Sequence, residues 1–153
     1  MMKRRKEGKT DYKARISLLK SSFPRVVFRK TNRYIIGQLI ESKEAKDKII
    51  TGVTSKHLIN YGWPKEKVGS LKSKPAAYLT GFLLGKKLSD LNREEVILDI
   101  GLNRSIAKSK IYYFVKGLVD AGINLKVSEK MLPKEEELDI PKEIKQQIEK
   151  KFV

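Results

Sequence analysis

Hydrophobic and polar positions interleave in the first third of the chain with the short period that is typical of β-strands. Residues 25–30 (RVVFRK) and 33–41 (RYIIGQLIE) are two such runs, and a third covers residues 48–53. Because short polar turns join them, the three runs predict an antiparallel three-strand meander. The second run is apolar on both faces except at Gln38, so we expect it in the interior of the sheet.

The second half of the chain follows the longer period of a helix. Residues 75–88 (PAAYLTGFLLGKKL) begin with a proline at a first-turn position, where its missing N–H costs nothing. Residues 109–121 place apolar side chains at i, i+3, i+4, i+7 and i+8, and Gly122 ends this helix. Residues 96–100 (VILDI) are a short apolar run that suits a buried strand. The order of these elements predicts an α/β fold in which helices pack against a mixed β-sheet.

Shorter helices are expected near both ends and in the middle of the chain. One covers residues 10–20, with Thr10 as its N-cap, and another follows Thr54 or Ser55. A last helix falls within residues 140–152.

These elements divide the chain into three parts. Residues 1–9 are rich in cations and predict a flexible basic arm that becomes ordered on meeting phosphate. Residues 10–125 form the expected α/β domain. Residues 126–153 form a C-terminal tail with the last expected helix, to which we assign no function.

The charge of the chain points to a polyanionic partner. Its 153 residues include 34 Lys and Arg against 18 Asp and Glu, a formal net charge of +16. The cations concentrate in residues 1–30, whereas residues 126–153 balance in charge. A general enrichment in lysine, for solubility or heat resistance, would raise glutamate in parallel. The uneven distribution therefore favours binding to a polyanion.

Composition also excludes several kinds of site. The chain has no cysteine, so it has no disulfide framework and no thiolate zinc site. Its single histidine, His57, makes a multi-histidine metal centre or a Ser-His-Asp triad hard to build. No apolar run is long enough to span a bilayer, and no apolar segment follows the basic N-terminus, so we expect neither a membrane protein nor a secreted one.

One motif keeps an enzymatic alternative open. Asp99 and Gly101 close the expected strand 96–100, as the acidic turn of a metal-dependent nuclease or phosphotransferase does. Such a site needs further carboxylates, and the strands before it offer Glu41 and little else. The Gly-x-x-x-Gly-Lys-Lys segment falls inside a helix and lacks the spacing of a phosphate-binding loop. Asp99 is better interpreted as a strand-end cap or as the partner of an arginine or lysine.

The first expected hairpin suits a nucleic-acid contact better. Arg25 and Arg29 share one side of its first strand, and Lys30, Asn32 and Arg33 surround its turn. On the second strand, a tyrosine and Gln38 share a face and offer a stacking ring and an amide that reads a base edge. The sequence favours RNA over DNA as the partner, with a generic polyanion-coating protein as the remaining alternative.

Several segments of the chain resemble, in their order and spacing, one ribosomal family. These segments are RRKEGKTDYKARISLLKS, PRVVFRKTNRYIIGQLI, KHLINYGW, PAAYLTGFLLGKK, VILDIGLNRS and GLVDAGI, and the match runs from Arg4 to Ile123. They resemble the large-subunit protein that binds 5S ribosomal RNA, number eighteen in the universal scheme, in its archaeal and eukaryotic form.

The resemblance implies a structural protein of the central protuberance with no enzymatic activity and no cofactor or metal. It also implies an α/β fold whose basic arm and sheet loops bind 5S rRNA and attach it to the large subunit. The implied partners are 5S rRNA, the large-subunit rRNA and neighbouring ribosomal proteins, with no membrane and no DNA, and the implied location is the cytoplasm.

The family's RNA contacts carry over to three groups of residues in this sequence. In the arm and the first helix they are Arg4, Arg5, Lys9, Tyr12 and Arg15. In the hairpin they are Arg25, Arg29, Lys30, Asn32, Arg33 and Gln38. After the third strand they are Ser55 and Lys56, and in the loop of residues 103–110 they are Arg104 and Lys108, where Ser105, Ile106 and Ala107 replace a more polar stretch.

Overall fold

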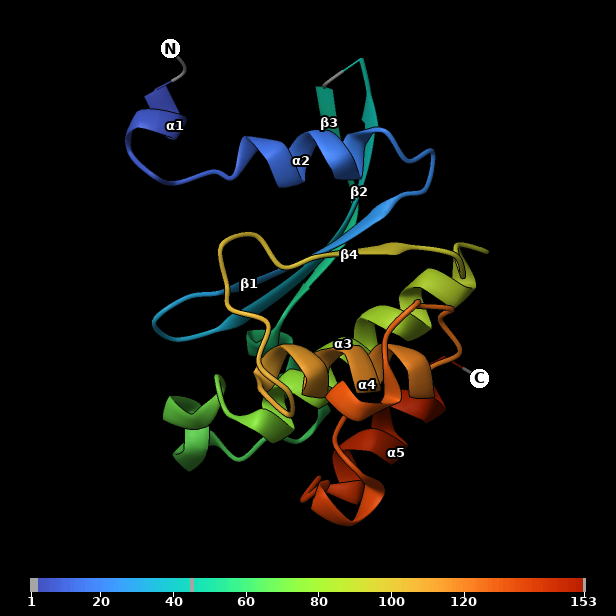
Figure 1. Ribbon diagram of the computed structural model, residues 1–153. Coiled ribbons are helices and arrows are strands. Elements are labelled where there is room, and N and C mark those ends of the chain that lie inside the picture. Colours follow the sequence, from blue (N-terminus) through green and yellow to red (C-terminus); the bar gives the residue numbers. More distant parts are fainter. Residues whose placement is uncertain (1–2, 45, 153) are drawn as a thin grey trace.

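A four-stranded mixed β-sheet separates two unequal layers of helices in the computed structural model (Figure 1). The structure describes residues 3–44 and 46–152, so the first two residues of the predicted arm lie outside it. The strands are β1 (Arg25–Lys30), β2 (Ile35–Lys43), β3 (Lys46–Thr54) and β4 (Ile97–Asp99), in the spatial order β3-β2-β1-β4. The first three are antiparallel and β4 is parallel to β1, which confirms the predicted α/β class and the meander.

Five α-helices and four short 3₁₀ helices complete the described part of the chain. The α-helices are α1 (Lys3–Lys6), α2 (Tyr12–Leu19), α3 (Lys74–Asp90), α4 (Lys110–Asp120) and α5 (Lys142–Lys151). The 3₁₀ helices are η1 (Ser55–Tyr61), η2 (Lys65–Ser70), η3 (Glu129–Met131) and η4 (Glu135–Glu137). None of these described helices has the length and apolar character needed to cross a membrane.

Two local predictions were wrong. Asp11, not Thr10, caps α2, because its carboxylate accepts hydrogen bonds from the backbone N–H groups of Lys13 and Ala14. The strand at residues 96–100 is not buried on both faces, because β4 lies at the edge of the sheet with Ile97 half-buried. By contrast, β2 lies between β1 and β3, as its apolar character predicted.

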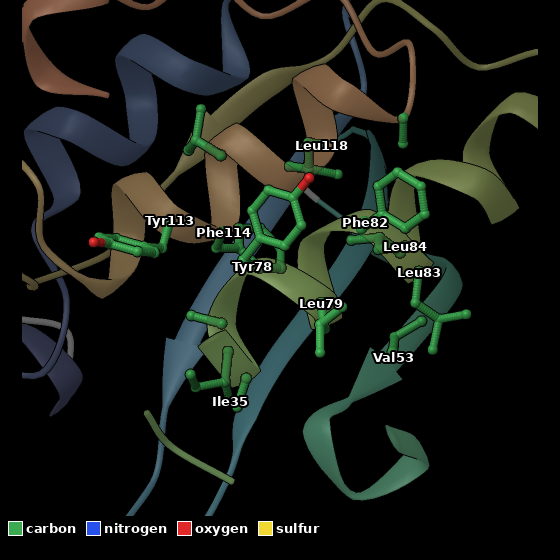
Figure 2. Close-up of a cluster of buried hydrophobic side chains, with 14 of the residues drawn as sticks. Ile35, Val53, Tyr78, Leu79, Phe82, Leu83, Leu84, Tyr113, Phe114 and Leu118 are labelled. Carbon is green, nitrogen blue, oxygen red and sulfur yellow. The ribbon is translucent and has the colours of Figure 1, made fainter. Parts of the chain in front are cut away.

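One face of the sheet packs against α3 and α4 and forms the core. Val26 and Phe28 of β1 are at most 1% exposed and lie on this face, since alternate residues of a strand point to the same side. Phe28 contacts Phe114 of α4 edge to face, with the ring centroids 5.2 Å apart. Figure 2 shows how Ile35 and Val53 from the strands meet the side chains of α3 and α4 in one cluster.

Helices α3 and α4 approach so closely that their contact requires glycine. A Cβ atom added at Gly81 would lie 2.1 Å from the carbonyl oxygen of Phe114, and one added at Gly117 would lie 2.1 Å from that of Tyr78. Real Cβ atoms do not come so near to backbone atoms. The Gly-x-x-x-Gly-Lys-Lys segment lies inside α3, as predicted, and its glycines allow the close packing of the two helices.

The C-terminal tail packs against the same core. Ile144 and Ile148 of α5 are at most 4% exposed. The Tyr78 hydroxyl donates to Asp120 at 2.6 Å, and Nζ of Lys145 lies 3.1 Å from the same hydroxyl. Burial raises the pKa of Tyr78 and the hydrogen bond to Asp120 raises it further, so the phenol stays protonated. This cluster joins α3, α4 and α5.

Replacing Gly81 with Ala is expected to lower the free energy of unfolding by about 1–3 kcal/mol, because the new methyl group forces two helix backbones apart. Gly69→Ala is the matched control, since no heavy atom lies within 4 Å of its added Cβ. Urea unfolding should show the control unchanged or stabilised by about 0.4–1 kcal/mol. Equal stability of the two variants would contradict the close contact.

Candidate nucleic-acid interface

The face of the sheet opposite α3 and α4 carries the charged side chains of β1. Arg25 and Arg29 alternate with the buried Val26 and Phe28, so they point away from the core, as predicted. Gln38 of β2 pairs with Val27, which lies between the two arginines, and is half-buried on the same face. In Figure 1 this face is the one toward α2.

Two arginines of β1 converge on one carboxylate at the end of β4. Arg25 Nη1 donates to Asp99 Oδ2 at 2.8 Å, and Arg29 Nη2 lies 3.4 Å from Asp99 Oδ1. The backbone N–H of Gly101 donates to the same Oδ1 at 2.9 Å. The Arg25 side chain is only 3% exposed, so this is a buried ion pair. Asp99 is therefore both a strand-end cap and an arginine partner, as its position indicated.

The network continues to β3 and α2 through Asp47. Arg25 Nη2 donates to Asp47 Oδ1 at 3.0 Å, and Arg15 Nη2 of α2 donates to Asp47 Oδ2 at 2.9 Å. Burial raises the pKa of Asp47, but hydrogen bonds from Ser42 and Arg15 and the charges of Arg15 and Arg25 outweigh burial and hold it below its usual value. Asp47 thus stays ionised at neutral pH and links α2 to the sheet.

Helix α2 contributes no buried residue to the described structure, and Ile16 is 54% exposed. Its connection to the sheet is polar, through Arg15. The arm before it is equally peripheral: α1 has no buried residue, and Arg4 Nε donates to the Thr10 hydroxyl at 2.9 Å. The arm and α2 are therefore weakly attached compared with the helices on the other face.

A cleft of about 810 Å³ lies between the arm, α2 and the adjacent ends of β1 and β4. Five of the predicted RNA-contacting cations line it: Arg4, Lys9, Arg15, Arg29 and Lys30. Two acids also line the cleft, but Asp11 caps α2 and Asp99 pairs with arginines. The structure thus gathers cations from the arm, α2 and β1 around one cleft.

The other predicted contacts differ in how exposed they are. Four are exposed: Asn32 and Arg33 in the turn after β1, and Arg5 and Lys56 elsewhere. Tyr12 and Gln38 are half-buried. Arg104 lines a second hollow, and Lys108 pairs with Glu137 of the tail. Arg25 and Ser55 are buried, and Ser55 accepts a hydrogen bond from the backbone of Ile35. An RNA contact by these two would require the loss of their internal bonds.

Asp47 is the important residue of this face that sequence reasoning did not find. A β-bulge between Leu39 and Ile40 shifts the register of β2 against β3, so Asp47 pairs with Ser42 on the arginine face. Without the shift, alternation along β3 would place it on the other face. No residue pattern in the sequence indicates such a bulge.

The alternative of a metal-dependent enzyme at Asp99 finds no support in the geometry. Both carboxylate oxygens accept from guanidinium or backbone donors, which leaves neither free to bind a cation. Across residues 3–44 and 46–152, no three His, Asp or Glu side chains converge in a way that suits a metal ion. His57 Nδ1 lies 3.1 Å from the backbone nitrogen of Thr54 and caps the helix η1.

Asp99→Ala is expected to lower the free energy of unfolding by about 3–5 kcal/mol, because it leaves the buried Arg25 guanidinium without its partner. Asp90→Ala, at the exposed end of α3, is the control and should stay within about 0.5 kcal/mol of the parent chain. Denaturant unfolding measures both. A loss in Asp99→Ala no larger than in the control would show that the pair contributes little.

Comparison with known proteins identifies the family of the chain. The family model for "Ribosomal large subunit proteins 60S L5, and 50S L18" matches residues 1–95. The chain is 48% identical to large ribosomal subunit protein uL18 of Korarchaeum cryptofilum over 136 residues, which cover 89% of this chain and 68% of the relative. Identity to the uL18 of Methanoculleus marisnigri is 46%, over 89% of this chain and 75% of that one.

A relative of lower identity matches a similar share of the chain. The uL18 of Halobacterium salinarum is 40% identical over 131 residues, which cover 86% of this chain and 69% of that one. Such identity over most of the chain establishes the family. The chain belongs to the uL18 family and is a structural, non-enzymatic constituent of the large ribosomal subunit in the cytoplasm, with ribosomal RNA and other ribosomal proteins as its partners.

Proposed function

We propose that this protein binds 5S rRNA through the cleft between its arm and the open face of its sheet, and mediates attachment of that RNA in the central protuberance. The observation that carries the proposal is the convergence of Arg4, Arg15 and Arg29, from α1, α2 and β1, on one cleft. The resemblance of the chain to the 5S rRNA-binding family supplies the identity of the RNA.

The charge balance of the cleft favours phosphate. Arg29 and Arg15 each have a carboxylate partner, yet the ion-pair network that they share holds three arginines against two aspartates and stays positive. Lys9 pairs with Glu7, but this exposed pair is weak and exchanges readily for an RNA phosphate. Each phosphate neutralised releases counterions, which makes affinity fall steeply with salt.

The hairpin turn and the arm take different parts in binding. Asn32 and Arg33 are exposed beside a turn that the Thr31 and Tyr34 backbones close with a 2.9 Å hydrogen bond. Side chains on such a rigid element fix the register of the RNA, and Gln38 on the adjoining strand supplies an amide. Residues 3–9 bury nothing, so we propose that they act as a flexible arm ordered by RNA.

Replacing Asn32 and Arg33 together with Ala is expected to weaken binding to 5S rRNA by about 2–4 kcal/mol, since a specific contact contributes roughly 1–3 kcal/mol. Binding to a scrambled RNA of equal length should weaken much less. Filter binding or fluorescence anisotropy at several salt concentrations measures both affinities. Gln38→Ala should show the same selectivity with a smaller loss.

The matched control removes two cations from the arm. Lys3→Ala with Lys6→Ala should weaken binding to both RNAs alike and reduce the salt slope by about two units. If the hairpin variant lost equal affinity for both RNAs, the specificity for 5S rRNA would not come from the turn. A parent chain that binds both RNAs equally would favour a generic polyanion-coating protein and overturn the proposal.

A further inference from the structure

A second basic hollow, of about 450 Å³, lies on the helix side of the hairpin. Its cations are Lys30, Lys74, Arg104 and Lys110, and Ile106 forms an exposed apolar rim. Lys30 and Asn103 line both this hollow and the cleft on the open face of the sheet. The two basic surfaces are therefore continuous at the end of β1.

Among the residues that the structure describes, the lysines of the second hollow have no acidic partner. Within the described ranges 3–44 and 46–152, neither Lys74 nor Lys110 has a carboxylate within 4.0 Å. Nζ of Lys74 lies 5.3 Å from the ring centroid of Tyr113, which holds the ammonium group in place without neutralising it. Burial lowers the pKa of Lys110, and the charges of Lys30, Lys72 and Lys74 lower it further. These ammonium groups thus repel one another in the absence of an anion.

Both lysines also occupy an unfavourable position in their helices. Lys74 is the first residue of α3 and Lys110 the first residue of α4, where the helix dipole is positive and acidic residues are preferred. Ser109, which precedes α4 and lines the hollow, makes no capping hydrogen bond with its side chain. Its buried Oγ has no hydrogen-bond partner among the described residues. An anion in the hollow would meet two ammonium groups beside the N-terminus of α4, where the Ser109 hydroxyl is left without a partner among the described residues.

We propose that this hollow binds a phosphate group of the RNA backbone, with Lys74 and Lys110 as its principal ligands. The inference rests on the proposed RNA-binding function and adds a phosphate-binding site outside the cleft. Because Lys30 and Asn103 belong to both surfaces, one RNA strand passes from the cleft across the loop of residues 101–109 into the hollow. Ile106, which is 58% exposed, then packs against the ribose or base of that nucleotide.

The test uses two variants of the full chain with equal charge loss. Lys74→Gln with Lys110→Gln removes the proposed ligands, and Lys142→Gln with Lys150→Gln removes two exposed lysines of α5, one of them also the first residue of its helix. We expect the first variant to lose about tenfold in RNA affinity and about one unit of salt slope, because one phosphate contact contributes about 0.9 units. The α5 variant should bind like the parent chain, and equal behaviour of the two variants would overturn the proposal.

The change in salt slope tests the phosphate site separately from the preference for 5S rRNA. Both variants are titrated against a 5S rRNA transcript and a scrambled RNA. A loss of salt slope on both RNAs supports the phosphate site even where the parent chain shows no preference for 5S rRNA, which is the outcome that defeats the proposed function.

Acetylation of lysines in the unmodified protein gives a second measurement that needs no variant. Mass spectrometry should show Lys74 and Lys110 protected when the 5S rRNA transcript is bound, and Lys142 and Lys150 as reactive as before. Undiminished reactivity of Lys74 and Lys110 in the RNA complex would contradict the site. Protection that arises only in the assembled subunit would assign the hollow to another component and equally overturn the proposal.

Discussion

The buried ion pair between Arg25 and Asp99 is the interaction on which the charged face of the sheet depends. It joins β1 to the edge strand β4 at 2.8 Å, and through Asp47 it reaches β3 and α2. A buried pair of this kind adds little net stability compared with apolar packing, because both ions lose their hydration. The ion pair instead determines where the arginines lie. Two carboxylates hold three arginines on one side of the sheet, and the excess of one cation leaves this network positively charged.

The two faces of the sheet consequently differ in how they are covered. On one, α3 and α4 meet β1 and β2 in a dense apolar core that needs glycine where the helices touch. On the other, α2 has no fully buried residue, and Arg15 bonds it to Asp47 of the sheet. The core on the first face supports the strands that lead into the hairpin turn, whereas α1 and α2 contribute no buried residue to either face. The C-terminal tail also holds the loop of residues 101–109 in place. The backbone N–H of Lys108 donates to the carbonyl of Met131, and the Lys108 ammonium group donates to the carboxylate of Glu137.

Local patterns predicted the elements but not the long-range pairings. The alternation in residues 25–30 and the period of α4 were strong enough to give the hairpin, the meander and the main helices correctly. The burial of Arg25 could not be predicted, because its partners lie 22 and 74 residues away. One of them, Asp47, faces it only because of the bulge beside Leu39. The convergence of the arm on the cleft depends on the same distant contacts, whereas the identity of the exposed cations at the turn was evident from the sequence.

Ultraviolet cross-linking in intact cells, followed by identification of both the cross-linked nucleotides and the cross-linked peptides, tests the central claim most directly. We expect 5S rRNA to dominate the cross-linked RNA and the cross-linked peptides to contain residues 30–33 and residues 3–15. Cross-links confined to α5, or distributed over many RNAs without enrichment of 5S rRNA, would contradict it.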